Sequence, residues 1–280
     1  MPNISTTLEK IDTIAIGGFD GMHRGHQELL KHLGANGAIL VIDSGYANLT
    51  PLLERKRHCS HEIIFFDLNE IRSFSGKEFI AKLKISFLSL KRVVVGYDFH
   101  FGNNRSCSTE DLISMFDGEV TVVPEFKQNG ISVHARTIRD LISRGDIKKA
   151  NSLLGYEYSI NSTVISGQGL GKKELYPTLN LANRDFLLPR EGVYAAFAQL
   201  DNEINHRAAV VFSGHRVTTD GSYALEVHVL NSEVESIKRV RLFIVDHIRD
   251  NQKFESLIAL KEAIKKDIEK ARVLTSHLAL

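Results

Sequence analysis

The chain has 280 residues, 43% of them hydrophobic and 25% charged, and it carries a formal net charge of +1 at pH 7. This composition predicts a folded protein with a sizeable core and excludes a disordered chain. A net charge so close to zero gives no general attraction to nucleic acid or to an anionic membrane, so neither is expected as a partner. The length allows one large domain or two of ordinary size.

The sequence also predicts a reducing, cytoplasmic environment. Residues 1–10 are polar and hold no apolar signal core, and no apolar run approaches the ~20 residues that span a bilayer. The two cysteines, Cys59 and Cys107, do not have the spacing of a metal site and cannot form a disulfide framework. No obligatory protein partner is indicated. The most basic run, Arg55-Lys56-Arg57-His58, is interpreted as a solvated surface turn in preference to a phosphate-binding patch.

The first half of the chain alternates short apolar runs with helical patterns. The runs are rich in Val, Ile or Phe and too short for helices, so buried strands are expected at 13–16, 38–42, 63–66, 92–95 and 120–123. Helical patterns occupy 26–33, 75–87 and 109–115. This alternation predicts an α/β fold, a parallel sheet with helices on both faces that binds ligands beyond the carboxyl ends of its strands.

Two further helices are expected before the pattern changes. They occupy 137–143 and 147–154, where Gly145 can end the first helix and Asp146 can cap the second. From Gly155 onward the α/β alternation stops, which places a domain boundary there. The chain is therefore expected to form one domain at 1–155 and a second at 156–280.

The second half reads as serial β-like segments separated by turn residues. They lie at 158–166, 192–200, 208–213, 223–230 and 240–248. Segments of this kind without intervening helices predict an antiparallel barrel. A closing helix at 254–272 should pack on the barrel through apolar residues at helical spacing, namely Leu257, Leu260, Ile264, Ile268 and Ala271.

A glycine-rich motif follows the first expected strand. It reads Gly17-Gly18-Phe19-Asp20-Gly21-Met22-His23-Arg24-Gly25-His26. Glycines let the backbone turn sharply and approach a ligand closely, and the N-terminus of a helix attracts phosphate. His23 and His26 lie three residues apart where the next helix begins, so both imidazoles can donate to the phosphate oxygens of a nucleotide. A zinc site would need further ligands, and none is adjacent.

This motif resembles the G-x-F-D-G-x-H-x-G-H motif of the bacterial FAD synthetases, which are HxGH nucleotidyltransferases. The resemblance implies a Rossmann-like domain in which the FMN phosphate attacks the α-phosphorus of ATP and pyrophosphate leaves, without a covalent enzyme intermediate. His23 and His26 would be its catalytic residues. The implied ATP contacts of this domain are Gly17, Phe19, Asp20, Gly21, His23, Gly25, His26 and Arg139.

Later segments continue the resemblance. V-G-Y-D-F-H-F-G at 95–102 is similar to the family's V-G-x-D-F-x-F-G, and 138–155 matches the helical pair that closes its first domain. The match implies that Arg139 meets ATP phosphates and that Asp98, Phe99 and Asp146 contact the flavin. Without it, 95–102 is a turn after a strand and Arg139 is an arginine on a helix surface.

The chain departs from this family in two places. His134-Ala135-Arg136-Thr137 replaces Ser-Ser-Thr-Arg, so hydroxyls that would cap a helix and touch phosphate are largely gone. Either Arg136 supplies a charged contact in their place or it points to solvent. Ile42-Asp43-Ser44-Gly45-Tyr46 stands where the family has T-F-x-P-x-P. Part of the flavin and nucleotide pocket is therefore expected to be built differently.

The barrel half carries a second set of candidate residues. The glycine-rich loop Gly167-Gln168-Gly169-Leu170-Gly171-Lys172-Lys173 fits neither a P-loop nor a Rossmann fingerprint. Thr178 and Asn180 lie two residues apart on extended chain, so they face one side and offer neutral oxygen ligands for Mg²⁺. Glu226 and His228 share one face of an expected strand.

The order of these segments, with L-P-R-E-G-V-Y at 188–194 between them, resembles riboflavin kinase over the rest of the chain. The resemblance implies transfer of phosphate from Mg²⁺–ATP to riboflavin, which forms FMN. Glu226 would be the general base for the riboflavin 5′-hydroxyl, and Thr178 and Asn180 would bind Mg²⁺–ATP. The further implied contacts are those of ATP with Gly167, Gly169, Gly171 and Lys172, and of the flavin with Arg249.

Two loops depart from that family as well. E-L-Y-P-T at 174–178 replaces L-G-F-P-T, and F-S-G-H-R-V-T at 212–218 replaces N-I-G-x-R-P-T. Three functions remain open: a bifunctional enzyme that makes FMN and then FAD, an enzyme with one active domain, and a non-catalytic flavin- or nucleotide-binding regulator. Retention of both histidines, of Thr178 and Asn180 and of Glu226 argues against the regulator, because a binding protein has no need of a base.

Overall fold

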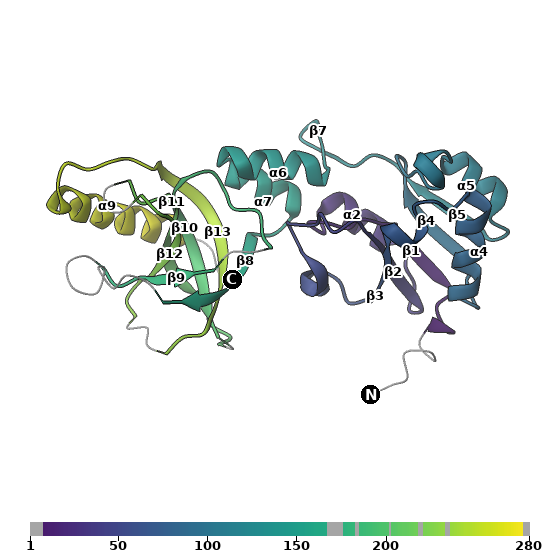
Figure 1. Ribbon diagram of the computed structural model, residues 1–280, viewed down its shortest axis with the longest axis horizontal. Helices are drawn as coiled ribbons and strands as arrows, with labels where there is room; N and C mark the ends of the chain where they lie inside the picture. The colour runs from purple at the N-terminus through teal and green to yellow at the C-terminus, as the bar shows by residue number, and fades with distance from the viewer. Residues whose placement is uncertain are drawn as a thin grey trace. The chain divides into compact units, whose positions relative to one another are not determined.

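The computed structural model describes residues 8–166, 176–182, 185–201, 203–217, 221–232 and 236–276. The chain divides into two compact units, Met1–Ala135 and Arg136–Leu280, whose elements are labelled in Figure 1. This division places the helical pair after Ala135 with the barrel, whereas the sequence pattern predicts a boundary at Gly155. Among the described residues, no helix combines the length and the apolar character needed to cross a bilayer.

The first unit is built on a five-stranded parallel sheet, as the sequence predicts. Its strands lie in the order β3-β2-β1-β4-β5. The chain builds outward on one side of β1 and then crosses to β4 on the other side. The strand order reverses between β1 and β4, and the carboxyl ends of strands at such a point are where α/β sheets bind ligands. The strands are β1 (Thr13–Gly17), β2 (Gly37–Asp43), β3 (Glu62–Asp67), β4 (Arg92–Gly96) and β5 (Glu119–Val123).

Helices cover both faces of this sheet because both faces are apolar. On β1, Ile14 and Ile16 belong to the same buried cluster as side chains of α4 (Gly76–Ser86) and α5 (Thr109–Met115). Ala15 belongs to the cluster of the other face, with Leu29 and Leu30 of α2 (Arg24–Leu30). The predicted strands and three helices are confirmed. The sequence did not predict the short elements η1 (Leu52–His58), α3 (Leu68–Ile71), η2 (Asn103–Arg105), β6 (Lys127–Gln128) and β7 (Ile131–Ser132).

The second unit begins with the expected helical pair, α6 (Ala135–Arg144) and α7 (Ile147–Leu154). Gly145 lies between them with a φ of +82°, the left-handed conformation that glycine adopts without strain. Asp146 occupies the N-cap position of α7, but its side chain makes no capping hydrogen bond. The expected capping role of Asp146 is therefore wrong, since the carboxylate lies 3.4 Å from the ammonium of Lys149 instead.

The rest of the second unit is a closed antiparallel barrel, which confirms the prediction from serial strands. Its order is β10-β11-β12-β9-β8-β13, and β13 pairs with β10 to close the ring. Central β10 is buried on both faces, because one face lines the barrel interior and the other packs under a helix. The strands are β8 (Tyr158–Ile165), β9 (Leu179–Leu181), β10 (Gly192–Leu200), β11 (Arg207–His215), β12 (Tyr223–Val229) and β13 (Arg239–Asp250).

The closing helix α9 (Leu257–Thr275) packs on the barrel over its second half. Ile264, Ile268 and Ala271 join the buried cluster that contains Val193 and Val245 of the barrel. Leu257 is 45% exposed, so its expected packing is wrong. The helix residues in this cluster begin at Ile264, and Leu260 is half-buried.

Candidate active sites

The loop after β1 is held in a strained conformation at the carboxyl edge of the sheet. Phe19 and Met22 have φ values of +48° and +37°, which non-glycine residues rarely adopt, and Gly21 has +84°. The side chains of Phe19 and Met22 are fully buried in the core beneath the loop, so packing stabilises this conformation. The Phe19 ring is therefore occupied by the core, and only its backbone remains for the predicted ATP contact.

Asp20 ties this loop to the segment that follows β2. Its buried carboxylate accepts hydrogen bonds from the backbone N–H groups of Asn48, Leu49 and Thr50, at 2.8–3.2 Å for the shortest of each. The Thr50 hydroxyl in turn accepts from the N–H of Gly21 at 2.7 Å. Asp20 thus positions the loop, and its predicted contact with ATP stays a prediction.

Arg55 supports the same loop from below. Its side chain is 1% exposed and donates to the carbonyl oxygens of Gly18, at 3.1 Å, and Leu52, at 3.0 Å. The guanidinium lies 5.7 Å from the ring centre of Phe65. Burial lowers the pKa of Arg55, and the negative charges of Asp20 and Asp43 act against this shift. The interpretation of this run as a solvated turn is therefore wrong for Arg55, which is a core residue.

The two motif histidines stack where α2 begins. Their rings lie 3.6 Å apart at 15°. His23 is the N-cap of α2, and its Nδ1 accepts from the His26 N–H at 3.2 Å. Because Nδ1 is the acceptor, neutral His23 carries its proton on Nε2, which is therefore a hydrogen-bond donor. A Cβ at Gly25 would lie 3.2 Å from His23 Nδ1, so glycine keeps this arrangement open.

His26 is held in its neutral form. Burial lowers its pKa well below the ordinary value, and the charges of His23, Arg55 and His134 lower it further. Its Nδ1 atom is buried and has no hydrogen-bond partner among the described residues. Buried polar atoms are normally paired, so this nitrogen is available to a ligand.

His134, Tyr97 and Glu125 form a polar cluster at the carboxyl ends of β4 and β5. The Tyr97 hydroxyl lies 3.3 Å from His134 Nε2 and 3.4 Å from Glu125 Oε1. Hydrogen bonds from Ser132 and Lys127 lower the pKa of Glu125. Since the charge of His134 reaches His26, this cluster belongs to the same site. His134 occupies the position at which the family has a serine, so an imidazole replaces a hydroxyl group there.

The predicted flavin contacts of this unit lie close by but differ in character. Asp98 is exposed just beyond the end of β4. Phe99 is half-buried, and its ring stacks 5.8 Å from that of Phe101 against the apolar core. The Asp98 carboxylate is therefore accessible to a ligand from solvent, whereas the Phe99 side chain contributes mainly to the core. Their flavin contacts stay predictions.

The barrel brings Thr178, Asn180 and Glu226 together, as the resemblance implies. Asn180 on β9 and Glu226 on β12 are partners in the strand register. The Thr178 hydroxyl donates to Glu226 Oε2 at 3.4 Å. Residues 167–175, which include Gly167, Gly169, Gly171 and Lys172, lie outside the described part of the chain, so the expected loop contacts are not placed.

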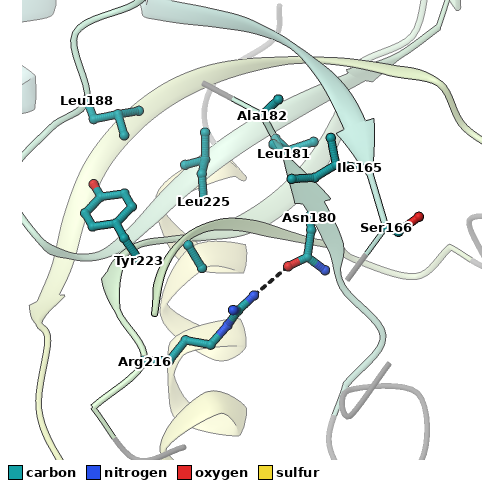
Figure 2. A pocket seen from close by; sticks show the side chains of 10 residues that line it. Ile165, Ser166, Asn180, Leu181, Ala182, Leu188, Arg216, Tyr223 and Leu225 are labelled. Atoms are coloured by element: carbon teal, nitrogen blue, oxygen red, sulfur yellow. Dashed lines mark hydrogen bonds between the residues drawn. The ribbon is translucent and has the colours of Figure 1, made fainter. Parts of the chain in front are cut away.

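A cavity of about 540 Å³ adjoins these residues. Its walls are largely apolar, with Leu181, Leu188 and Leu225 among them, and Asn180, Arg216 and Tyr223 supply polar atoms. Figure 2 shows the Arg216 side chain reaching toward Asn180 at one side of this cavity. A cavity with apolar walls and a few polar groups suits an aromatic small molecule.

Three predicted residues have other surroundings in the second unit. Arg249 is held by the buried Asp267 of α9 through hydrogen bonds of 2.9–3.0 Å, and its guanidinium lies over Phe254. Asp146 is exposed at the start of α7, and Arg139 is half-buried on α6. Their contacts with flavin and ATP stay predictions, and Arg249 would have to share its guanidinium with Asp267.

The sequence did not single out Arg55, Tyr97 or Arg216 as functional residues. Arg55 gives no local signal, because only the tertiary fold places it beneath the β1 loop. Arg216 falls within the altered segment at 212–218, where the family's R-P-T becomes R-V-T. Because the arginine of the family motif is retained there, the sequence could have indicated a functional role for Arg216.

We expect Arg55→Met to unfold the β1 loop. The change removes the buried donors of two backbone carbonyls, so the free energy of unfolding of the first unit should fall by on the order of 3 kcal/mol. Urea titration followed by circular dichroism measures the loss. Lys56→Met is the matched control, since Lys56 is exposed on the same turn. Equal stability of the two variants would contradict the supporting role of Arg55.

The lowered pKa of His26 predicts a pH dependence of local stability. The unfolded chain binds this proton near pH 6.5 and the folded chain only at lower pH, so stability should decrease as the pH falls below about 6.5. Hydrogen–deuterium exchange of residues 13–33 should quicken from pH 7 to 5.5, after correction for intrinsic rates. His26→Gln should flatten this dependence, and His32→Gln, at an exposed histidine, should not. An unchanged dependence in His26→Gln would refute it.

Comparison with known families assigns both halves of the chain. The family model of riboflavin kinase matches residues 154–275, and that of FAD synthetase matches residues 58–137. A crystal structure described as a macrolide-efflux protein from Streptococcus pneumoniae is similar with a TM-score of 0.82 and 28% identity, over 93% of this chain and 94% of that one. That description applies to the Streptococcus protein.

Named relatives match over nearly the whole length. The bifunctional riboflavin kinase/FMN adenylyltransferase of Buchnera aphidicola is 30% identical over 91% of this chain and 90% of its own. The protein of that name from Pseudomonas fluorescens is 29% identical over 94% of this chain and 93% of its own. The chain therefore belongs to the bifunctional riboflavin kinase/FMN adenylyltransferase family.

Proposed function

We propose that the protein converts riboflavin to FMN in its barrel and FMN to FAD at the carboxyl edge of its parallel sheet. The observation that carries this proposal is that each unit gathers its own set of reactive side chains. The first unit has the stacked pair of His23 and His26, and the second has Glu226 beside Asn180 and Thr178. ATP, riboflavin and FMN are the small-molecule partners. The cytoplasmic location stays a prediction.

The adenylylation step depends on the start of α2. An oxygen of the FMN phosphate attacks the α-phosphorus of ATP, and the bond from that phosphorus to the bridging oxygen of pyrophosphate breaks. His23 Nε2–H donates to phosphate oxygens as they gain negative charge, and the helix N-terminus adds backbone donors. The negative charge of the phosphates would also favour protonation of His26, which would then donate a charged hydrogen bond beside the neutral donor of His23. The donors of His23 and of the helix N-terminus are in place before the substrates bind, so they lower the barrier without reorganisation.

The phosphorylation step depends on Glu226. The riboflavin 5′-hydroxyl oxygen attacks the γ-phosphorus of ATP, the bond to the β–γ bridging oxygen breaks, and Glu226 accepts the hydroxyl proton. Glu226 Oε2 faces the Thr178 hydroxyl, so it is the oxygen within reach of an alcohol at this place. The apolar side chains of the adjoining cavity suit the flavin ring system of the acceptor.

The oxygen groups present fit a bound Mg²⁺. Thr178 Oγ1 and Asn180 Oδ1 are hard neutral ligands, and such a pair suits a metal that keeps waters and phosphate oxygens in its other positions. Bound there, Mg²⁺ would neutralise charge on the phosphates of ATP. No group of three His, Cys, Asp or Glu side chains able to hold a metal occurs among the described residues, so the metal would depend on the nucleotide for further ligands.

A single assay separates this function from its alternatives. Purified protein is incubated with riboflavin, ATP and Mg²⁺, and the products are resolved by chromatography. FAD indicates two active units, FMN alone indicates an active barrel only, and neither product favours a flavin- or nucleotide-binding regulator.

The two steps should separate by mutation. His23→Ala with His26→Ala removes the donors at the start of α2, so FAD formation from FMN should be abolished. Phosphorylation of riboflavin should be nearly unchanged, because the barrel has its own ATP site. Both rates are measured on one preparation whose circular dichroism matches wild type. Equal loss of both activities in the folded variant would exclude two independent sites.

Glu226→Gln should impair the kinase alone. The amide keeps the shape of the side chain but accepts no proton at neutral pH, so turnover of riboflavin should fall by ~10²-fold or more. FMN adenylylation is the internal control and should not change. A variant within a few-fold of wild-type kinase activity would show that Glu226 has a structural role.

A further inference from the structure

Arg216 joins the two key residues of the barrel site. Its Nε donates to Glu226 Oε1 at 2.7 Å, and Nη2 lies 2.6 Å from the same oxygen. Nη2 also donates to Asn180 Oδ1 at 2.7 Å, the contact drawn in Figure 2. Nη1 donates to the Ser222 hydroxyl at 2.7 Å. One guanidinium therefore bridges the candidate base and a candidate metal ligand.

Backbone hydrogen bonds fix the position of Arg216 beside Glu226 and Asn180. Its N–H donates to the carbonyl of Ser222 at 2.9 Å, and its own carbonyl accepts from Gly221 at 3.1 Å. The preceding residue, His215, is fixed by Glu191, whose carboxylate accepts from the His215 N–H at 3.1 Å and lies 2.8 Å from its Nδ1. The main chain is thus anchored on both sides, and movement at this position is left to the long side chain.

The contact with Asn180 and a bound metal are in conflict. A Mg²⁺ ion lies about 2.1 Å from its oxygen ligands, so an ion on Asn180 Oδ1 would be less than about 5 Å from the Arg216 nitrogen that uses the same oxygen. Like charges so close repel strongly in a half-buried site. The contact of Nε with Glu226 uses a different nitrogen and does not have to break when Nη2 leaves Asn180.

We propose that Arg216 is a displaceable counter-ion of the kinase site. In the ligand-free protein it holds Glu226 and occupies Asn180 Oδ1. When metal and nucleotide bind, the cation takes Asn180 Oδ1, and the guanidinium turns to a phosphate oxygen, for which its planar fork is well suited. Arg216 also keeps Glu226 Oε1 engaged, so that the hydroxyl of the acceptor would take the place of the Thr178 hydroxyl at Oε2. This inference rests on the proposed kinase function for the identity of the ligands.

Metal binding in the absence of nucleotide tests the proposal directly. Mn²⁺ is titrated into the full-length protein, and free Mn²⁺ is followed by electron paramagnetic resonance. Arg216→Met removes the competing charge and frees Glu226, so Mn²⁺ should bind at least about tenfold more tightly than to wild type. Arg216→Lys keeps the charge and should gain little. Arg239→Met, at an exposed arginine on β13, is the matched control and should gain nothing.

A gain of metal affinity is a result that a merely structural arginine would not give. Arg216→Gln replaces Arg216→Met if the latter does not fold, since the amide still donates to Glu226. Ser222→Ala removes only one tether of the guanidinium, at an exposed serine, and should give a smaller gain in the same direction. Unchanged Mn²⁺ affinity in the folded neutral variants, or an equal gain in Arg239→Met, overturns the proposal.

Kinase kinetics on the same preparations separate this inference from the proposed function. Arg216→Met should raise the KM for ATP about tenfold, because one charged contact to phosphate is lost. A wild-type protein that makes no FMN, together with the gain in Mn²⁺ affinity, would refute the kinase function and retain the counter-ion. Normal FMN formation without any gain in affinity would refute the counter-ion and retain the kinase.

Discussion

Both candidate sites depend on pairing the charged groups that folding buries or half-buries. An ionised side chain removed from water has to find hydrogen-bond partners, and in this chain those partners are the loops that carry the reactive groups. The Asp20 carboxylate accepts hydrogen bonds from three backbone N–H groups, and the Arg55 guanidinium donates to two backbone carbonyl oxygens of the segments around the loop that leads to His23. In the barrel, Arg216 is paired with Glu226. The need to pair each charge therefore decides the shape of both sites.

The two units bring distant residues together by different geometry. In the parallel sheet, strand ends from separate parts of the chain meet at one edge, so the loop after β1 lies with the segments after β4 and β5. In the antiparallel barrel, cross-strand pairing sets Asn180 opposite Glu226 within the strands themselves. In the first arrangement the reactive side chains lie on loops, which tolerate substitutions such as His134 for serine. In the second arrangement they lie on paired strands, where a substitution is tolerated only if the strands still pair.

This difference gives the departures from the family a physical meaning. The relatives are 29–30% identical over most of the chain. The altered segments fall at the ends of elements, at 42–46 where β2 ends, at 134–137 where α6 begins and beside Arg216 after β11. At the first site an imidazole that interacts with His26 replaces a hydroxyl. At the second, loss of the proline after Arg216 leaves the arginine in place.

The sequence by itself determined the α/β unit, the barrel and the ranges of the predicted strands within a few residues, while its assignment of the reactive groups stays a prediction. The periodicity of apolar residues indicates whether one or both faces of an element are buried, and the order of the motifs indicates which loops follow which strands. Both kinds of information lie in short stretches of sequence, so they can be read without the tertiary structure. It could not determine that Arg55 is buried, that Phe99 serves the core, that Leu257 is exposed or that Arg249 is held by Asp267. Charged side chains look alike in sequence whether they meet water, a ligand or a buried partner. Only the tertiary structure decides this, because the partner comes from a distant segment of the chain.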